Sequence, residues 1–201
     1  MKNFKEANMK AAATVIAVAG LFSVPASAQT VGSEVQRDVN QQQRIEQGLK
    51  SGSLNTREAS QLERGEARIE RMESNAAKDG KLSPAEKARI QRAQNQESRQ
   101  INRLESNAAK GNPNSASSQR MQADVQRNVN QQQRIEQGIQ SGQLTNREAG
   151  KLERGQARVN RAEARAGADG HVGPNEQRRI QKAENRQSKR IYREKHDAQK
   201  H

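Results

Sequence analysis

The feature that most constrains the fold of this chain is an internal repeat. Residues 35–103 align without a gap to residues 125–193, and about 40 of the 69 aligned positions are identical. The sequence VNQQQRIEQG, for example, occurs at residues 39–48 and again at residues 129–138. A duplicated module of about 75 residues is expected to fold in the same way twice. Between the copies, residues 111–118 read GNPNSASS, which predicts a flexible linker of turn-forming and small polar residues.

Each module is predicted to form three helices. Turn-forming segments interrupt each copy twice, at residues 51–58 and 79–86 of the first and at residues 141–148 and 169–176 of the second. Capping boxes are predicted at three of these segments, by Asn55 with Glu58, Ser83 with Glu86, and Thr145 with Glu148. We therefore expect an all-α protein with two tandem three-helix modules, at residues 29–110 and 119–201, joined by the linker.

The middle helix of each module carries a narrow apolar seam with heptad-like spacing. The seam residues are Ala59, Leu62, Gly65, Ile69, Met72 and Ala76, and in the second copy Ala149, Leu152, Gly155, Val159, Ala162 and Ala166. Glu residues follow seam positions and Arg residues precede them, which predicts one acidic and one basic edge. Two interpretations remain open: packing inside each three-helix module, or an oligomeric coiled coil through this helix.

Residues 1–28 have the pattern of a cleavable signal peptide. Three Lys and one Glu stand within residues 1–10, residues 11–24 are apolar, and residues 26–28 read Ala-Ser-Ala. The apolar run is shorter than the roughly 20 residues of a spanning helix. We therefore expect cleavage between Ala28 and Gln29 and a soluble periplasmic or secreted protein. No Cys follows the cleavage site, which excludes a lipid anchor at a cysteine.

The composition of the remaining chain argues against an enzyme. Its net charge is +11, compared with +13 for the whole sequence, and Tyr192 is its only aromatic residue. The absence of Cys excludes disulfides and thiolate metal sites. Nearly every carboxylate is expected at a helix edge beside an Arg, and the apolar core is expected to be thin. We therefore predict no catalytic residues and no cofactor, because a desolvated site has little room to form.

The segment at residues 75–86 resembles the second half of an EF-hand calcium loop. Asp79 and Gly80 stand in the middle of the segment and Glu86 stands last, but Ala77 occupies a position where a calcium loop has an oxygen ligand. In the second copy only Asp169 and Glu176 remain as charged ligands. The resemblance implies a weak site for calcium or another divalent cation at Asp79, Glu86, Asp169 and Glu176. The capping box of Ser83 explains Glu86 without a metal.

The last helix is the most basic segment of the sequence, and residues 115–201 carry a net charge of +8 against +3 for residues 29–114. Its cations are Arg178, Arg179, Lys182, Arg186, Lys189, Arg190 and Arg193. Such a stripe suits an anionic envelope polymer or a membrane surface. Sequence-specific nucleic-acid binding is not expected, because stacking aromatics and known reader motifs are absent.

The preferred hypothesis is therefore a non-enzymatic exported protein that binds a polyanion. The alternatives are a divalent-cation-responsive helix-loop-helix protein and a homo-oligomeric scaffold that assembles through the helix seams.

Overall fold

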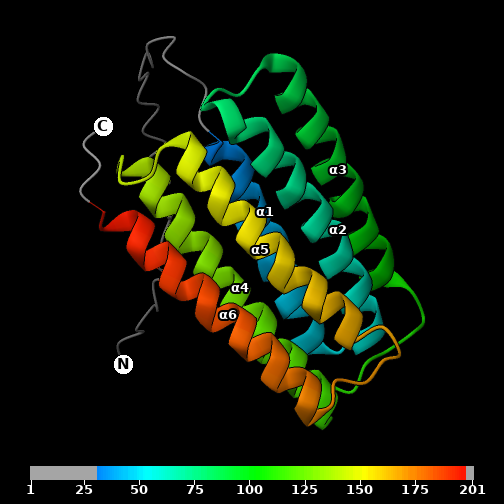
Figure 1. Cartoon of the computed structure of the whole chain (residues 1–201). Helices are drawn as coiled ribbons and strands as arrows, with labels where there is room; N and C mark the ends of the chain where they lie inside the picture. The colour runs from blue at the N-terminus through cyan, green and yellow to red at the C-terminus, as the bar shows by residue number, and fades with distance from the viewer. Residues whose placement is uncertain (1–30, 198–201) are drawn as a thin grey trace, which may run out of the picture.

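The computed structural model describes residues 31–197, and the signal peptide predicted at residues 1–28 lies outside this range. The described chain is all helical, which confirms the predicted fold class (Figure 1). The first repeat contains α1 (Gly32–Ser51), α2 (Thr56–Ala76), a 3-10 turn η1 (Ala77–Asp79) and α3 (Pro84–Ser106). The second contains α4 (Ala116–Gln140), α5 (Asn146–Ala166) and α6 (Pro174–Lys195).

Helices α2, α3 and α5 begin where the sequence predicts caps. Asn55 Oδ1 accepts a hydrogen bond from the backbone N–H of Glu58 at 3.0 Å, and Glu58 Oε2 accepts one from the backbone N–H of Asn55 at 3.0 Å. All three predicted capping boxes are present. The turns before α3 and α6 contain Gly80 and Gly170 at φ +84° and +90°. Only Gly adopts this conformation without strain.

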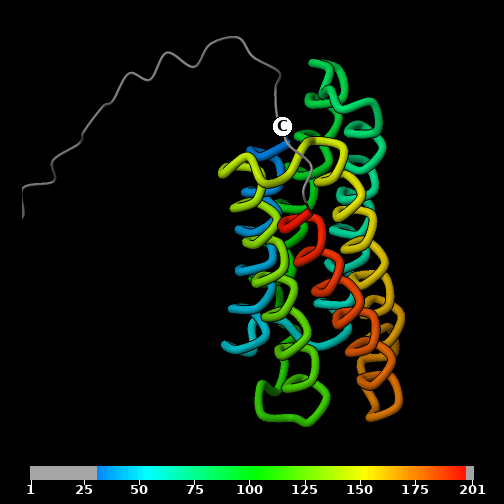
Figure 2. The backbone as a smooth tube through the Cα atoms, turned by 60° about the vertical axis from the view of Figure 1, so that its left-hand side comes forward, coloured from blue at the N-terminus to red at the C-terminus, as the bar shows by residue number. Residues whose placement is uncertain are grey.

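The two repeats pack against each other through equivalent helices. The most extensive helix pair of the described chain is α2 with α5, followed by α1 with α4. The α2–α5 pair runs antiparallel, since the end of α2 meets the start of α5: a Cβ on Gly150 would lie 2.6 Å from the Cβ of Ala77. Helices α1 and α4 also run in opposite directions (Figure 1). Helix α3 packs on α1 and α2, and α6 packs on α4 and α5. The result is a four-helix centre with one flanking helix from each repeat (Figure 2).

The apolar core belongs to both repeats together. One cluster joins Ile69 and Ile90 of the first repeat to Ile135, Leu152 and Ile191 of the second, and a second cluster is also shared. From the sequence, each module is predicted to enclose its own core. The structure differs because a three-helix module with few aliphatic residues exposes the seam of its middle helix until the other repeat covers it.

The segment between the repeats is also shorter than the predicted linker. Helix α4 begins at Ala116, so residues 116–118 are helical rather than part of a connecting segment.

The Glu residues of α2 and α5 lie inside the bundle, whereas the sequence pattern predicts them at helix edges beside Arg. Glu63, Glu66, Glu70 and Glu73 of α2 have exposed fractions of 0%. The expectation is wrong because α2 contacts α1, α3, α4 and α5, so its buried face is wider than the apolar seam. The cations of the same helices face outward and form the surface described next.

Candidate functional site

The outer face of α5 consists of cations. Its exposed residues from the first turn to the last are Arg147, Lys151, Arg154, Arg158 and Arg165, and Arg161 between them is half-buried. The Glu residues of this helix, in contrast, are all buried. The spacing of three or four residues keeps every cation on one side of the helix.

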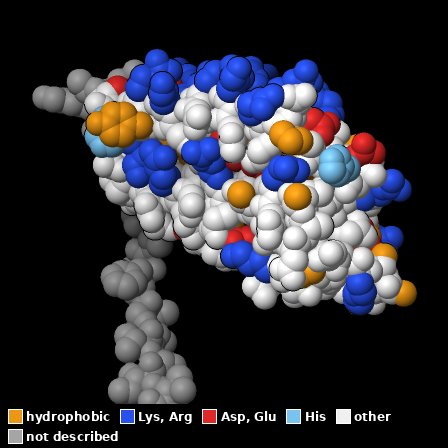
Figure 3. All heavy atoms as spheres, turned by 90° about the horizontal axis from the view of Figure 1, so that it is seen from below, with side chains coloured by type: hydrophobic (Ala, Val, Ile, Leu, Met, Phe, Trp, Pro, Cys, Tyr) orange, Lys and Arg blue, Asp and Glu red, His pale blue; other side chains and the backbone are white. Residues whose placement is uncertain are grey.

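Helix α2 adds a second row of cations beside the first. Its exposed basic residues are Arg57, Arg64, Arg68 and Arg71, followed by Lys78 in η1. We call these five residues and the six cations of α5 the basic face. In Figure 3 blue side chains gather along the upper edge of the molecule, the side on which α2 and α5 lie toward the viewer in Figure 1.

Nothing on the two helices neutralises the basic face, since α2 and α5 have no exposed Asp or Glu. Burial lowers the pKa of Arg161, and repulsion from Arg71, Arg165 and Arg158 lowers it further. Arg57 is bound instead by a backbone group, the carbonyl of Asp169 at 2.9 Å. The guanidinium groups therefore repel one another and would be stabilised by an anion lying across them.

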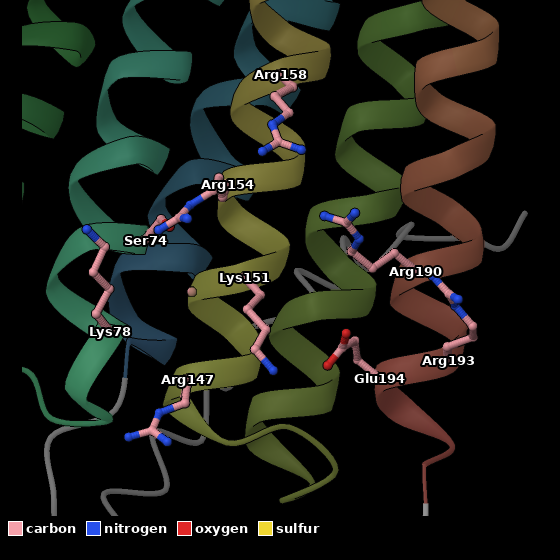
Figure 4. Close-up of a pocket in the computed structure, with 10 residues that line it drawn as sticks. Ser74, Lys78, Arg147, Lys151, Arg154, Arg158, Arg190, Arg193 and Glu194 are labelled. Atoms are coloured by element: carbon pink, nitrogen blue, oxygen red, sulfur yellow. The ribbon is translucent and has the colours of Figure 1, made fainter.

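A groove of about 590 Å³ opens at one end of the basic face. It is lined by Ser74 and Lys78, by Arg147, Gly150, Lys151, Arg154 and Arg158 of α5, and by Arg190, Arg193 and Glu194 of α6. Figure 4 shows Arg190 reaching from α6 toward α5, with Lys151 extending from the opposite wall. Arg154 Nε donates to Ser74 Oγ at 3.2 Å, which holds this guanidinium over the contact between α2 and α5.

The structure divides the seven cations predicted on the last helix. Arg190 and Arg193 line the groove, and Arg186 joins Arg158 and Arg190 around a smaller adjoining hollow. Arg178, Arg179 and Lys182 are exposed near the start of α6 and line neither, while Lys189 lies on the outer side of the helix. The cations of α5 are not among the predicted site residues, although their three- and four-residue spacing is visible in the sequence, because Arg beside the apolar seam predicts ion-paired packing of helix edges.

The four predicted metal ligands serve as loop and cap acceptors. Asp79 Oδ1 accepts from the backbone N–H of Lys81 at 2.9 Å, and Glu86 Oε2 accepts from that of Ser83 at 3.0 Å. In the second repeat, Asp169 Oδ1 and Glu176 Oε2 accept equivalent bonds, both at 2.8 Å.

The geometry suitable for a metal lies elsewhere in the described chain. Two groups of acidic side chains bring one oxygen each within 4.8 Å of the others: Asp38, Glu73 and Glu153, and Glu148, Glu194 and Asp197. Neither group contains a residue of the two EF-hand-like loops. The calcium site at those loops therefore stays a prediction.

Within residues 31–197, no helix combines the length and apolar character needed to cross a membrane. Comparison of the chain with protein-family models, with curated proteins and with solved structures gives no match.

Proposed function

We propose that this protein binds an anionic polymer along the basic face, with the strongest contacts in the groove between α5 and α6. The observation that carries the proposal is the complete separation of charge on α2 and α5, where every Glu is buried and the outer positions carry cations. A solvated helix surface normally mixes both signs of charge. Rows of cations on helices that expose no acid of their own are instead suited to a ligand that carries repeated negative charges.

The size of the basic face favours a polymer over a small anion. Its cations extend along the full lengths of α2 and α5, and Arg190 and Arg193 of α6 continue them across the groove. A polymer that contacts several of these cations releases a counterion for each neutralised charge, so its affinity falls steeply with salt. The chemistry that the face recognises is a phosphate or carboxylate repeat, without a requirement for stacked bases.

We further propose export as the context of this binding, on the basis of the sequence pattern of residues 1–28. In the cell envelope, phosphorylated lipopolysaccharide and the carboxylates of peptidoglycan present such repeats. The exposed Tyr192 is stacked on His196, with ring centroids 4.1 Å apart, and does not line the groove. This arrangement supports binding through charge rather than through base recognition.

Retention on a heparin column and on immobilised lipopolysaccharide, each eluted with salt, tests the proposal. The test variant is Arg154→Gln with Arg190→Gln, which removes two groove cations. Its matched control is Arg178→Gln with Arg179→Gln, which removes two exposed cations near the start of α6, outside the groove. We expect the test variant to elute at clearly lower salt than the control on both supports. Equal elution of the two variants would overturn the groove as the site, and lack of retention of the unmodified protein would overturn polyanion binding.

The scaffold alternative receives no support from an exposed apolar surface. The seam residues Ala59, Leu62 and Ile69 have exposed fractions of 0–1%, because the helices of the same chain cover them. Met72 is partly buried against the same core. We therefore do not propose assembly through the seam of α2.

A further inference from the structure

Seven carboxylates lie at the centre of the bundle, on the opposite side of α2 and α5 from the basic face. Each has an exposed fraction of 0%. They are Asp38 of α1, Glu63, Glu66, Glu70 and Glu73 of α2, and Glu153 and Glu163 of α5. Enclosing an ionised carboxylate in a protein interior costs several kcal/mol unless a cation or hydrogen bonds compensate the charge. The groups that face these carboxylates therefore determine how the bundle tolerates them.

Amide side chains, not cations, supply the hydrogen bonds. Gln94 Nε2 donates to Asp38 Oδ1 at 2.8 Å and to Glu73 Oε1 at 3.2 Å. Gln132 Nε2 donates to Glu153 Oε2 at 3.1 Å. The ion pairs of residues 31–197 join Arg44 to Glu105, Lys50 to Glu46, Lys87 to Glu34, and Arg127 to Glu184, and none includes one of the seven. None of the seven therefore forms an ion pair in the described chain. Burial raises the pKa of the Asp38 carboxyl, while the charge of Arg37, the cation that acts on it, lowers this pKa.

Three of the carboxylates converge from three different helices. Asp38, Glu73 and Glu153 each offer one oxygen, and these oxygens lie within 4.8 Å of one another. Oxygen ligands of a single hard cation, each 2.0–2.6 Å from the ion, are separated by about 3–5 Å. Asp38 Oδ2, Glu73 Oε2 and Glu153 Oε1 also lack a hydrogen-bond partner. The spacing of the group and its free oxygens both suit one bound ion.

Glu66 and Glu70 provide a second and independent observation. Both oxygens of Glu66 and Oε2 of Glu70 are buried without a hydrogen-bond partner. Burial raises the pKa of Glu66 well above its usual value, and repulsion from Asp38 contributes most among the neighbouring charges. For Glu70, burial is followed by repulsion from Glu153 and Asp38. Glu66 thus has no hydrogen-bond partner, whereas Glu70 keeps one free oxygen because its Oε1 accepts hydrogen bonds from Gln132 and Asn160. The spacing of Glu66, Glu70 and Glu73 places them on one face of α2.

We call the set of Asp38, Glu66, Glu70, Glu73 and Glu153 the first position. The equivalent set of residues, the second position, has amides in place of three of these acids. The equivalents of Asp38, Glu73 and Glu153 are Asn128, Glu163 and Glu63, and those of Glu66 and Glu70 are Gln156 and Asn160. Asn128 Nδ2 donates to Glu163 Oε2 at 2.7 Å, and Gln156 Nε2 donates to Asn128 Oδ1 at 2.8 Å. The fold therefore accepts amides at these positions, and the extra carboxylates of the first position need a different explanation.

We propose that the bundle interior binds one hard divalent cation, such as Ca²⁺, Mn²⁺ or Mg²⁺, through Asp38, Glu73 and Glu153, with Glu66 and Glu70 available as further oxygen ligands. The donor set consists of oxygen atoms alone, which favours these ions over the softer metals that prefer His or Cys. Because Asp38 and Glu73 come from the first repeat and Glu153 from the second, the ion also links the two repeats. This site is separate from the EF-hand-like loops and from the basic face.

The test begins with the full chain treated with a chelator and then dialysed. Each of the three ions is titrated alone by calorimetry, and the thermal unfolding temperature is recorded with and without the ion. We expect one ion per chain and a higher unfolding temperature for the loaded protein. The test variant is Asp38→Asn, which gives the first position the amide that the second repeat already accommodates. This variant should fold, and its affinity for the ion should be at least about tenfold lower than that of the unmodified protein.

The control variant is Glu163→Gln, which changes a buried Glu of the second position and should leave the affinity unchanged. Binding that is equally strong in Asp38→Asn would place the ion outside the cluster and overturn the proposal. The proposal would also be overturned if none of the three ions binds and metal-free Asp38→Asn unfolds at a higher temperature than the metal-free unmodified protein. The carboxylates would then be neutralised by protons. Circular dichroism of each variant verifies that the helices are intact.

Discussion

Gln132 of α4 donates a buried hydrogen bond of 3.1 Å to Glu70 of α2, so the second repeat satisfies a carboxylate of the first. The same amide lies 3.1 Å from Oε2 of Glu153 in its own repeat. The equivalent residue of the first repeat, Gln42, donates only to Glu63 at 3.1 Å. A single amide in the second repeat thus serves two buried carboxylates and joins the two halves of the core.

Replacement of Gln132 by Leu should destabilise the fold more than replacement of Gln42 by Leu. The first change removes two buried hydrogen bonds, to Glu70 and Glu153, and the second removes one, to Glu63. Each variant orphans one carboxylate oxygen, at a cost of about 1–3 kcal/mol, and the first also loses a bond to Glu70, which keeps the bond that Asn160 donates. Urea unfolding of both variants measures the difference in the free energy of unfolding. An equal loss in the two variants would show that the bond between Gln132 and Glu70 contributes little.

Stability should fall as the pH rises from 5 to 8. Burial, followed by repulsion from Glu184, raises the pKa of Asp124 from 3.8 to about 8, with Glu63 raising it further and Gln177 and Arg127 lowering it. Between these two values the folded protein retains a proton that the unfolded chain has released. Stability in this range therefore decreases with pH, by about 1.4 kcal/mol per unit for each such proton. Thermal unfolding in the presence of a chelator at pH 5, 6.5 and 8 measures the trend.

Asp124→Asn tests whether this group contributes to the trend. The variant lacks the titrating proton, so its stability should depend less steeply on pH and should exceed that of the unmodified protein most at pH 8. Asp169→Asn, at an exposed loop, serves as the control and should retain the original slope. A slope that is identical in all three proteins would contradict the assignment to Asp124.

The start of α3 should be stabilised by its side-chain cap, whereas the start of α6 lacks one. Ser83 Oγ accepts a hydrogen bond from the backbone N–H of Glu86 at 3.3 Å, while the equivalent residue, Gly173, has no side chain to do so. Ser83→Ala should cost about 1 kcal/mol, and Gly173→Ser should add a few tenths, because Gly173 already has extended dihedrals. Denaturant unfolding of the two variants provides the measurement. An unchanged denaturation midpoint for Ser83→Ala would show that the hydrogen bond from the backbone N–H of Glu86 to Ser83 Oγ does not stabilise α3.

The sequence predicted local structure far better than the packing of the repeats. Ser83 and Glu86 stand three residues apart, so the start of α3 could be derived from a few neighbouring residues. The burial of Glu66 could not, because it depends on α1, α3 and α5 reaching the same side of α2 from distant parts of the chain. The same reason explains the basic face: Arg154 and Arg71 belong to different repeats, and only antiparallel pairing of α2 with α5 places their rows side by side.

The pairing of the repeats should depend on small residues where α2 and α5 meet. Gly150 faces Ala77, and at the other end Gly167 faces Ser60, so that one glycine stands at each contact. A Cβ on Gly150 would lie 2.6 Å from the Cβ of Ala77, and neither atom can rotate away. Gly150→Ala should therefore lower the free energy of unfolding by about 1–3 kcal/mol, despite the roughly 1 kcal/mol gain in helix propensity.

Gly155→Ala is the matched control for this substitution. Its new Cβ would meet the end of the Gln187 side chain, which can move, so the loss should be smaller. Thermal and urea unfolding of both variants would provide the comparison. If Gly150→Ala is as stable as the unmodified protein, the close approach of α2 and α5 does not limit the packing of the repeats. If it unfolds in two separate transitions, the repeats fold independently and the shared core adds little to their stability.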